Sequence, residues 1–479
     1  MPKLALKIGL PIVIGAFVVI VLISRGAADS VLSFEWQTSE RLLLSAEDAK
    51  KADFSISVSP RGAHVAYVIK EQQSGKDQYR LRLDDRDVGV YSQVWETIFS
   101  PDGKRTAFLV SYGAGEGDRF IVDGKEQEKY EALMPGMAAF SPDGSLFGYQ
   151  AVKDKNVFIV INGVPGKAYE MVWGIGQRSI APLVFSANGK HYAYQARRDN
   201  KDFVVHDGKE HPVELALDHL PALSPDGARW AVVTSEPIGN NKLAPRVVVD
   251  GQPFGRTYHY IGNRPVFSPD GKRIAYSPTL RWDPGQDQEG ICVVDGKELE
   301  PRYEFVRTIV FSPDSKRLAY EAKRRGKFVV VLDGQESKEY DLVRSASLIF
   351  SPDSRRFAYR VSSNLGEFIV VDGVEQGPYS MTLTPPIFSS DSRHVIYLAA
   401  SAKEQFAVID GEARGKYEAV SVPDSGTDAL RRSNHPIEFE APQFLTGDSF
   451  GYVAKRGGAY YWIEERRVRH LAPQKAKPK

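Results

Sequence analysis

The residues of this chain that could do chemistry are its carboxylates, nine histidines and one cysteine. A zinc hydrolase needs two histidines and a glutamate at helical spacing, and the sequence contains no His-Glu-x-x-His motif. The densest histidines, His206, His211 and His219, flank a turn and the strand after it, which favours solvated surface positions over a metal site. Cys292 lies in a β-branched run typical of a buried strand, so we expect an unreactive thiol. We therefore predict no catalytic residue, no metal ligand and no cofactor.

Many of the aspartates stand in two short phrases, Ser-Pro-Asp-Gly and Val-Val-Asp-Gly, that recur along the chain. Calcium binding by a loop of the EF-hand kind needs alternating Asp or Asn residues and a later Glu, and no segment fits that pattern. Proline before the aspartate sets φ for a type I turn, and the aspartate side chain bonds its own backbone. We therefore interpret these aspartates as turn formers.

The charge of the chain is balanced, with 62 basic residues against 61 acidic ones and a net charge of +1. A dedicated nucleic-acid binder needs a basic excess that replaces the counterions of the phosphate backbone. We therefore predict that the chain has no nucleic-acid partner.

The first phrase, Phe-Ser-Pro-Asp-Gly-Lys-Arg-x-Ala-Tyr in its fullest form, repeats every 38 to 45 residues. Its serines are Ser59, Ser100, Ser141, Ser186, Ser224, Ser268, Ser312, Ser351 and Ser389, and a degenerate tenth copy begins at Phe444. The second phrase follows each copy and usually precedes a tyrosine, as Asp123-Gly124 precedes Tyr130. Asp-Gly between β-branched runs is the preferred signal for a two-residue hairpin. Each repeat of about 40 residues thus holds four strands, which is typical of a propeller blade.

The predicted fold class is therefore all-β, a β-propeller of four-stranded blades. Nine clear copies of the repeat and a degenerate tenth copy predict nine or ten blades. One ring is favoured over two smaller rings, because no Pro/Gly/Ser-rich linker divides the chain near its midpoint. We assign residues 51–468 to the propeller, residues 29–50 to a linker or closing strand, and residues 469–479 to a disordered basic tail.

The repeats resemble those of TolB-type propellers, which are relatives of WD-repeat blades found in many bacterial envelope proteins and in prolyl-oligopeptidase-like enzymes. The resemblance covers roughly residues 50 to 465 and rests on Ser-Pro-Asp-Gly-Lys-x-x-Ala-Tyr recurring in register. It implies the propeller fold and says little about function. The chain lacks the α/β domain of some 250 residues that would accompany peptidase activity in such enzymes.

The N-terminus has the pattern of a membrane-targeting segment. Lys3 and Lys7 precede an uncharged apolar run from Ile8 to Ile23, and Arg25 follows it. We predict a helix within residues 1–28 that is either an uncleaved signal anchor or a cleaved signal peptide, with Gly26-Ala27-Ala28 as the cleavage region. Positive charge before the apolar run predicts translocation of the rest of the chain, to the periplasmic or extracellular side of the membrane.

In a four-stranded blade, both repeated turns lie on one face of the ring, and the variable loops lie on the other. Exposed Trp and Arg are enriched where proteins bind one another. The candidate partner-binding residues on the variable face are Arg281, Trp282, Asp283, Glu289, Arg324, Arg325, Trp173 and Arg178. The sequence thus favours a non-catalytic scaffold or binding module for a protein or cell-envelope partner. The alternative is a carbohydrate-binding or carbohydrate-active propeller with its site at the central funnel.

Overall fold

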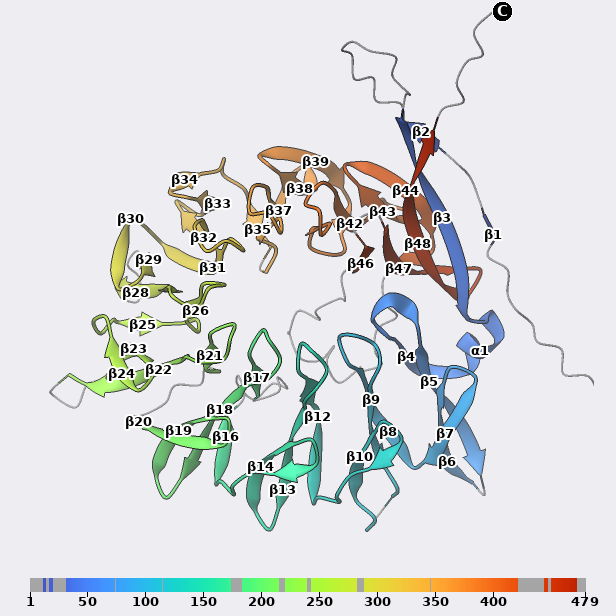
Figure 1. Cartoon of the computed structure of the whole chain (residues 1–479), viewed down its shortest axis with the longest axis horizontal. Helices are drawn as coiled ribbons and strands as arrows, with labels where there is room; N and C mark the ends of the chain where they lie inside the picture. Colours follow the sequence, from blue (N-terminus) through green and yellow to red (C-terminus); the bar gives the residue numbers. More distant parts are fainter. Residues whose placement is uncertain are drawn as a thin grey trace, which may run out of the picture.

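The computed structural model describes residues 12–13, 17–19, 32–73, 75–113, 115–173, 183–214, 220–238, 243–281, 288–344, 346–420, 443–446 and 449–471. These residues form ten antiparallel sheets, which follow one another around a common axis as blades 1 to 10 (Figure 1). This arrangement confirms the predicted all-β propeller and its higher predicted blade number.

Each blade is a meander whose first strand lies innermost and whose last strand lies outermost. Blades 1 to 3 consist of β4 (Ala52–Val58), β5 (Val65–Gln73), β6 (Lys76–Leu83) and β7 (Arg86–Tyr91); β8 (Gln93–Phe99), β9 (Thr106–Ser111), β10 (Asp118–Val122) and β11 (Lys125–Glu126); and β12 (Ala132–Phe140), β13 (Phe147–Lys153), β14 (Asn156–Ile161) and β15 (Val164–Pro165). Blades 4 to 6 consist of β16 (Met171–Trp173) with β17 (Val184–Phe185), β18 (Tyr192–Arg198), β19 (Lys201–His206) and β20 (Lys209–Val213); β21 (Ala222–Leu223), β22 (Trp230–Pro237), β23 (Leu243–Val249) and β24 (Gln252–Phe254); and β25 (Tyr260–Ile261) with β26 (Val266–Phe267), β27 (Ile274–Tyr276) with β28 (Pro278–Arg281), β29 (Glu289–Val294) and β30 (Lys297–Tyr303).

The remaining blades repeat this plan. Blades 7 to 9 consist of β31 (Phe305–Phe311), β32 (Leu318–Arg324), β33 (Lys327–Leu332) and β34 (Gln335–Glu336); β35 (Leu342–Val343) with β36 (Ile349–Phe350), β37 (Phe357–Ser363), β38 (Gly366–Val371) and β39 (Val374–Tyr379); and β40 (Met381–Thr382) with β41 (Ile387–Phe388), β42 (Val395–Ala400), β43 (Gln405–Ile409) and β44 (Glu412–Tyr417). Blade 10 consists of β45 (Ala419–Val420) with β46 (Gln443–Thr446), then β47 (Ser449–Arg456), β48 (Ala459–Leu471) and β3 (Leu32–Leu44).

The repeated turns hold each blade by a hydrogen-bond network that explains their composition. In the second blade the buried Ser100 hydroxyl donates to Asp102 Oδ1 at 2.6 Å, accepts the Arg105 N–H, and so lowers the pKa of Asp102 to about 2. Arg105 Nε bonds Asp123 Oδ2 at 2.8 Å, and the same guanidinium lies 5.1 Å from the centre of the Phe140 ring in the next blade. Asp123 and Gly124 both have positive φ, as the predicted two-residue turn requires. The aspartates are therefore turn formers, as the sequence predicts.

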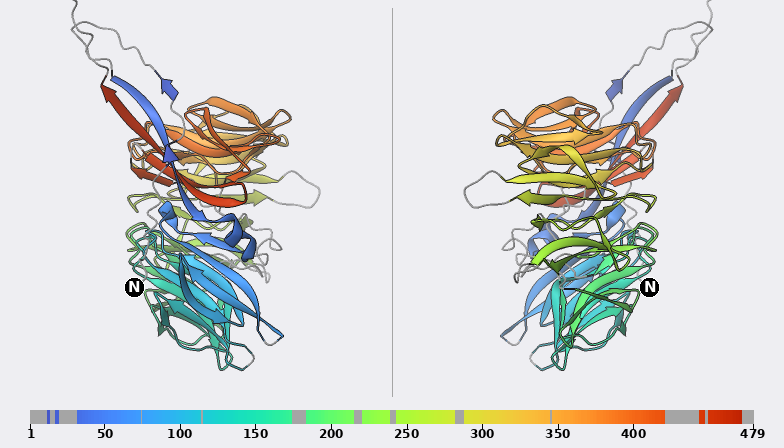
Figure 2. Two further views of the ribbon diagram at one scale, coloured as in Figure 1. Left: turned by 90° about the vertical axis from the view of Figure 1, so that its right-hand side faces the viewer. Right: turned by 90° about the vertical axis from the view of Figure 1, so that its left-hand side faces the viewer.

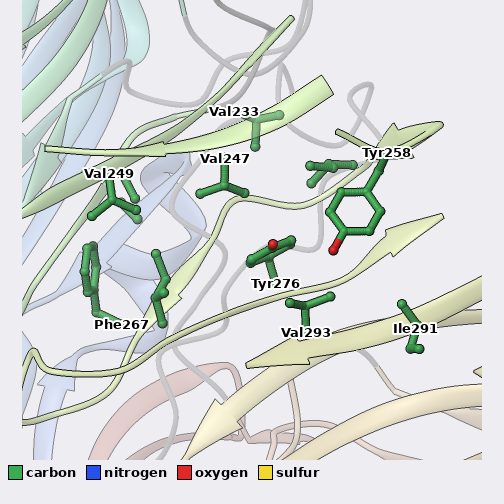
Figure 3. Packing of buried hydrophobic residues seen from close by; sticks show 12 residues of the cluster. Val233, Val247, Val249, Tyr258, Phe267, Tyr276, Ile291 and Val293 are labelled. Atoms are coloured by element: carbon green, nitrogen blue, oxygen red, sulfur yellow. The ribbon is translucent and has the colours of Figure 1, made fainter. Parts of the chain in front are cut away.

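The hydrophobic core is divided into ten clusters, and each cluster joins two neighbouring blades. Figure 3 shows the cluster between blades 5 and 6, where Val247 of β23 lies over Tyr276 of β27 and Val249 lies beside Phe267 of β26. The cluster with Val58 and Trp462 joins blade 10 to blade 1. Ten clusters that link ten blades in a cycle establish a single closed ring, so the alternative of two smaller rings is wrong.

The ring is closed by pairing the two ends of the described chain. β3 is the outermost strand of the tenth blade and lies antiparallel to β48, with Leu32 opposite Leu471 and Leu44 opposite Tyr460. Figure 2 shows these two strands, in blue and red, running side by side beyond the body of the ring. β3 lies within residues 29–50, the range assigned from the sequence to a linker or closing strand. β48 ends at Leu471, beyond the predicted end of the repeats at residue 468.

The predicted N-terminal helix is not found in the part of that segment that the structure describes. Ile12–Val13 and Phe17–Val19 are the short strands β1 and β2, which pair with β3. Among the described residues the longest helix, α1 (Ala46–Lys51), is too short and too polar to cross a membrane. The other residues of the predicted targeting segment lie outside the described ranges.

Candidate functional site

The predicted binding residues of blade 6 lie at the loop that joins β28 to β29. Arg281 ends β28 and Glu289 begins β29. Glu289 Oε1 accepts a bond of 2.8 Å from Arg302 Nη1 of the neighbouring strand β30. Trp282 and Asp283 lie outside the described residues, so the structure places only the two ends of this loop.

The predicted residues of blades 7 and 4 lie in different settings. Arg324 folds back onto its own blade and donates to Glu336 Oε2 at 2.8 Å, whereas Arg325 is exposed in a tight turn with positive φ. Trp173 ends β16, an inner strand of blade 4, and Arg178 lies outside the described residues. The structure thus places Glu289 on blade 6 and Arg324 on the neighbouring blade 7. Trp173 lies on blade 4, which blade 5 separates from blade 6.

Most inner strands share a second pattern, which begins at the tyrosine that follows an Asp-Gly or Asn-Gly turn. In most of these blades the tyrosine is buried, and the residue three positions later is buried as well, as Tyr130 with Leu133 and Tyr169 with Val172 illustrate. Side chains alternate along a strand, so the residues two and four positions after the tyrosine point to the side opposite that third residue. We call these residues, at the start of the inner strands, the inner rim.

The inner rim carries large apolar side chains that remain exposed. They are Trp95 (43% exposed), Met134 (52%), Met171 (46%), Tyr260 (44%) and Met381 (52%). The first three stand on the consecutive blades 2, 3 and 4. Trp173, which the sequence predicts to bind a partner, stands four residues after Tyr169, at an inner-rim position of blade 4. Exposed aromatic and methionine side chains gathered along one rim of a rigid frame are typical of surfaces that bind a partner.

Blades 7 and 8 place arginines at the equivalent rim positions. Arg307 donates to the fully buried Glu321 through Nη2 at 2.6 Å and Nε at 2.7 Å, and Thr308 bonds the other oxygen. Burial raises the pKa of Glu321, although Arg307 and Thr308 oppose this shift. The bonds to Glu321 hold the Arg307 guanidinium in one orientation at the rim.

The second rim arginine, Arg344, is held by a network that joins blades 8 and 9. Arg344 pairs with Glu367, which also accepts bonds from the Thr382 N–H at 2.7 Å and the Thr382 hydroxyl at 2.5 Å. Burial alone would raise the pKa of Glu367, but these bonds from Thr382 and Arg344 lower it. Arg360 donates to the Thr382 carbonyl. The network contains two arginines and one glutamate, so this part of the rim is basic.

Glu96, next to Trp95, stands at a bulge of the inner strand β8. Its Oε2 accepts the N–H of Gly136 in the next blade at 3.1 Å. Burial raises the pKa of Glu96 to about 7, and the Gly136 bond opposes that shift without cancelling it. This carboxyl therefore titrates near neutral pH at the apolar part of the rim.

Two further residues, Ser449 and Cys292, have side chains that act as nucleophiles in some enzymes. The tenth repeat contains a Gly-x-Ser-x-Gly sequence at residues 447–451, but Ser449 is buried and begins β47, opposite Arg466 of the antiparallel β48. A hydrolase nucleophile needs an exposed strand-to-helix turn instead. Cys292 is fully buried, and burial raises the pKa of its thiol to about 12, as expected for an unreactive cysteine.

Solved structures similar to this chain include three propeller-containing proteins. TolB from Acinetobacter baumannii is 12% identical over 61% of this chain and 81% of its own, with a TM-score of 0.26. An oligogalacturonate lyase from Vibrio parahaemolyticus is 9% identical over 75% and 98%, with a TM-score of 0.32. The β-propeller domain of the Trilobed protease from Pyrococcus furiosus is 14% identical over 76% and 95%, with a TM-score of 0.31. No protein-family model and no curated protein matches the chain. At identities of 14% or less and TM-scores of 0.32 or less, these similarities do not indicate what the site binds.

Proposed function

We propose that this propeller is a non-catalytic binding module whose inner rim receives an apolar segment of a protein partner. The single observation that carries the proposal is the exposure of Trp95, Met134 and Met171 at inner-rim positions of three consecutive blades. Burying such side chains against a partner removes apolar surface from water, at about 25 cal/mol per Å². Arg307 and Arg344 favour a partner segment that also carries acidic groups.

Site-specific crosslinking tests this proposal in cells that express the full chain. A photoreactive amino acid at position 134 or 171 is expected to give a discrete adduct with one partner, identified by mass spectrometry. Val164 and Val374 are matched controls, because they are more exposed than the two methionines but lie on the outermost strands. Combined Trp95→Ala and Met134→Ala substitutions should weaken binding of that partner tenfold or more, since a hot-spot truncation costs about 2 kcal/mol. Adducts of equal yield at 164 and 374, or none at the rim, would contradict the proposal.

We further propose that the ring lies outside the cytoplasm, held at the membrane or released from it. The support is the apolar run from Ile8 to Ile23 behind Lys3 and Lys7. Protease added to cells with a permeabilised outer layer and an intact inner membrane is expected to digest the ring while a cytoplasmic marker protein survives. Digestion that requires lysis of the inner membrane would refute this location.

A further inference from the structure

Blade 4 contains a group of potential metal ligands on the face that carries the repeated turns. His191 ends the Ser186 turn, and Asp207 begins the Asp207-Gly208 turn after β19. The repeat brings these two positions together in every blade, and in blade 4 His206 joins them. One ligand atom from each of His191, His206 and Asp207 lies within 4.8 Å of the other two.

His206 distinguishes blade 4 from its sister blades. The residue before the turn aspartate or asparagine is apolar in the other repeats, where it is Leu83, Val122, Ile161, Val249, Val294, Leu332, Val371 or Ile409. His206 Nε2 is buried and has no hydrogen-bond partner. Leaving a buried ring nitrogen without a partner is unfavourable, and a bound ion would supply that partner.

The geometry around Asp207 fits a bound ion. Asp207 Oδ2 lies 3.6 Å from His206 Nε2, which is too far for a hydrogen bond. Two ligand atoms at about 2.0–2.1 Å from one tetrahedral ion lie roughly 3.3 Å apart, close to this separation. The same Oδ2 accepts a hydrogen bond of 2.6 Å from His191 Nδ1, and a bound ion would replace the proton of that bond and widen the pair. His211 adds a third imidazole, whose ring centre is 6.5 Å from that of His206.

We infer that His191, His206 and Asp207 form a site for a divalent transition-metal ion of the zinc class. Imidazole nitrogens with one carboxylate suit Zn²⁺, Co²⁺, Ni²⁺ and Cu²⁺, whereas Mg²⁺ and Ca²⁺ prefer oxygen ligands. The site is independent of the inner rim, because it lies at the turn ends of the strands and the rim lies at their other ends.

The location gives the ion a structural role between blades 4 and 5. His191 packs against Gly227 and His211 lies 5.3 Å from the ring of Trp230, both in blade 5. The core cluster at this boundary, within the described ranges, has only four fully buried members, whereas the other clusters have seven or more. The arginine that reaches into the next blade from blades 2, 5, 6, 7 and 8 is replaced here by His191. The ion would therefore strengthen the contact between blades 4 and 5, where the buried apolar cluster of the described residues is the smallest.

Zinc titration of the purified, tag-free full chain tests this inference. Calorimetry is expected to show one Zn²⁺ per chain, and His206→Val should weaken its affinity at least about tenfold. Valine is the residue type that sister blades carry at this position, so this variant preserves the fold. His394→Gln is the matched control, because His394 forms the same 2.6 Å pair with Asp410 in blade 9 but has no second histidine beside it.

A second measurement separates a specific site from weak surface binding. Zn²⁺ should raise the unfolding temperature of the wild-type chain and of His394→Gln, but not that of His206→Val or His191→Gln, because only a site in the folded state stabilises it. Zinc affinity and unfolding temperature that are the same in His206→Val as in the wild type would overturn the inference.

Discussion

A variant that lacks residues 1–44 is expected to lose its folded monomeric state, whereas a variant that lacks residues 1–31 keeps it. The first truncation removes β3, which faces β48 from Leu32 opposite Leu471 to Leu44 opposite Tyr460. A ladder of this length holds about a dozen backbone hydrogen bonds, each with a net worth of about 0.5–1.5 kcal/mol. The loss is thus on the order of 10 kcal/mol, which equals the whole stability of many domains.

Side chains of β3 add to that loss. Glu40 pairs with Arg456 at 2.6 Å, and Thr38 donates to the buried Glu465. Leu44 belongs to the cluster that joins blade 10 to blade 1. Without β3, the long strand β48 presents an unpaired edge on which other chains can assemble.

Size-exclusion chromatography with light scattering and a thermal unfolding scan measure the outcome. The shorter truncation is expected to elute as the full-length chain does and to unfold at a similar temperature. The longer truncation is expected to aggregate or to show no cooperative transition. A well-folded monomer without β3 would mean that blade 10 needs only three strands and that the ring closes without pairing the chain ends.

The second large effect is a dependence of stability on pH that comes from Glu96. Its folded-state pKa is about 7, raised from 4.5 by burial. Below about pH 4.5 the carboxyl is protonated in both the folded and the unfolded chain, so protonation of Glu96 does not lower the free energy of unfolding. Between about pH 4.5 and 7 the unfolded chain releases the proton while the folded chain keeps it, so the free energy of unfolding falls. The total loss is about 3 kcal/mol at 1.36 kcal/mol per pKa unit, and it is complete above pH 7.

Glu96→Gln should remove this dependence, because the amide stays neutral and its oxygen still accepts the Gly136 N–H. Urea unfolding at pH 5 and pH 8 is expected to show similar stability of variant and wild type at pH 5, and a variant more stable by about 3 kcal/mol at pH 8. Glu116→Gln, an exposed carboxylate of the same blade, is the control. Parallel pH profiles of the Glu96→Gln variant and the wild type would show that Glu96 is ionised in the folded chain at neutral pH.

The interactions within each blade are visible in the sequence, because they are local. Ser100 bonds Asp102 two residues later and the Arg105 N–H five residues later, so one short phrase contains the whole turn. The Asp123-Gly124 hairpin is equally local. Repetition of these phrases was sufficient to predict a propeller with up to ten blades. The apolar run near the N-terminus was a weaker guide, because it predicted a helix where the described residues form short strands on β3.

The sites depend on contacts between blades, which no short phrase contains. Met134 and Met171 are apolar residues of inner strands, and only the packing of one blade on the next leaves them exposed. His191 stands 15 residues before His206, and the pairing of β18 with β19 brings the two rings together.

The sequence by itself determined the repeat, its turns and the class of fold, because the hydrogen bonds that encode them span a few residues. The tertiary structure alone decided the number of rings, the partner of β3, the exposed rim and the histidine group on blade 4. These features depend on which faces of neighbouring blades meet, and residues far apart in the chain determine that packing.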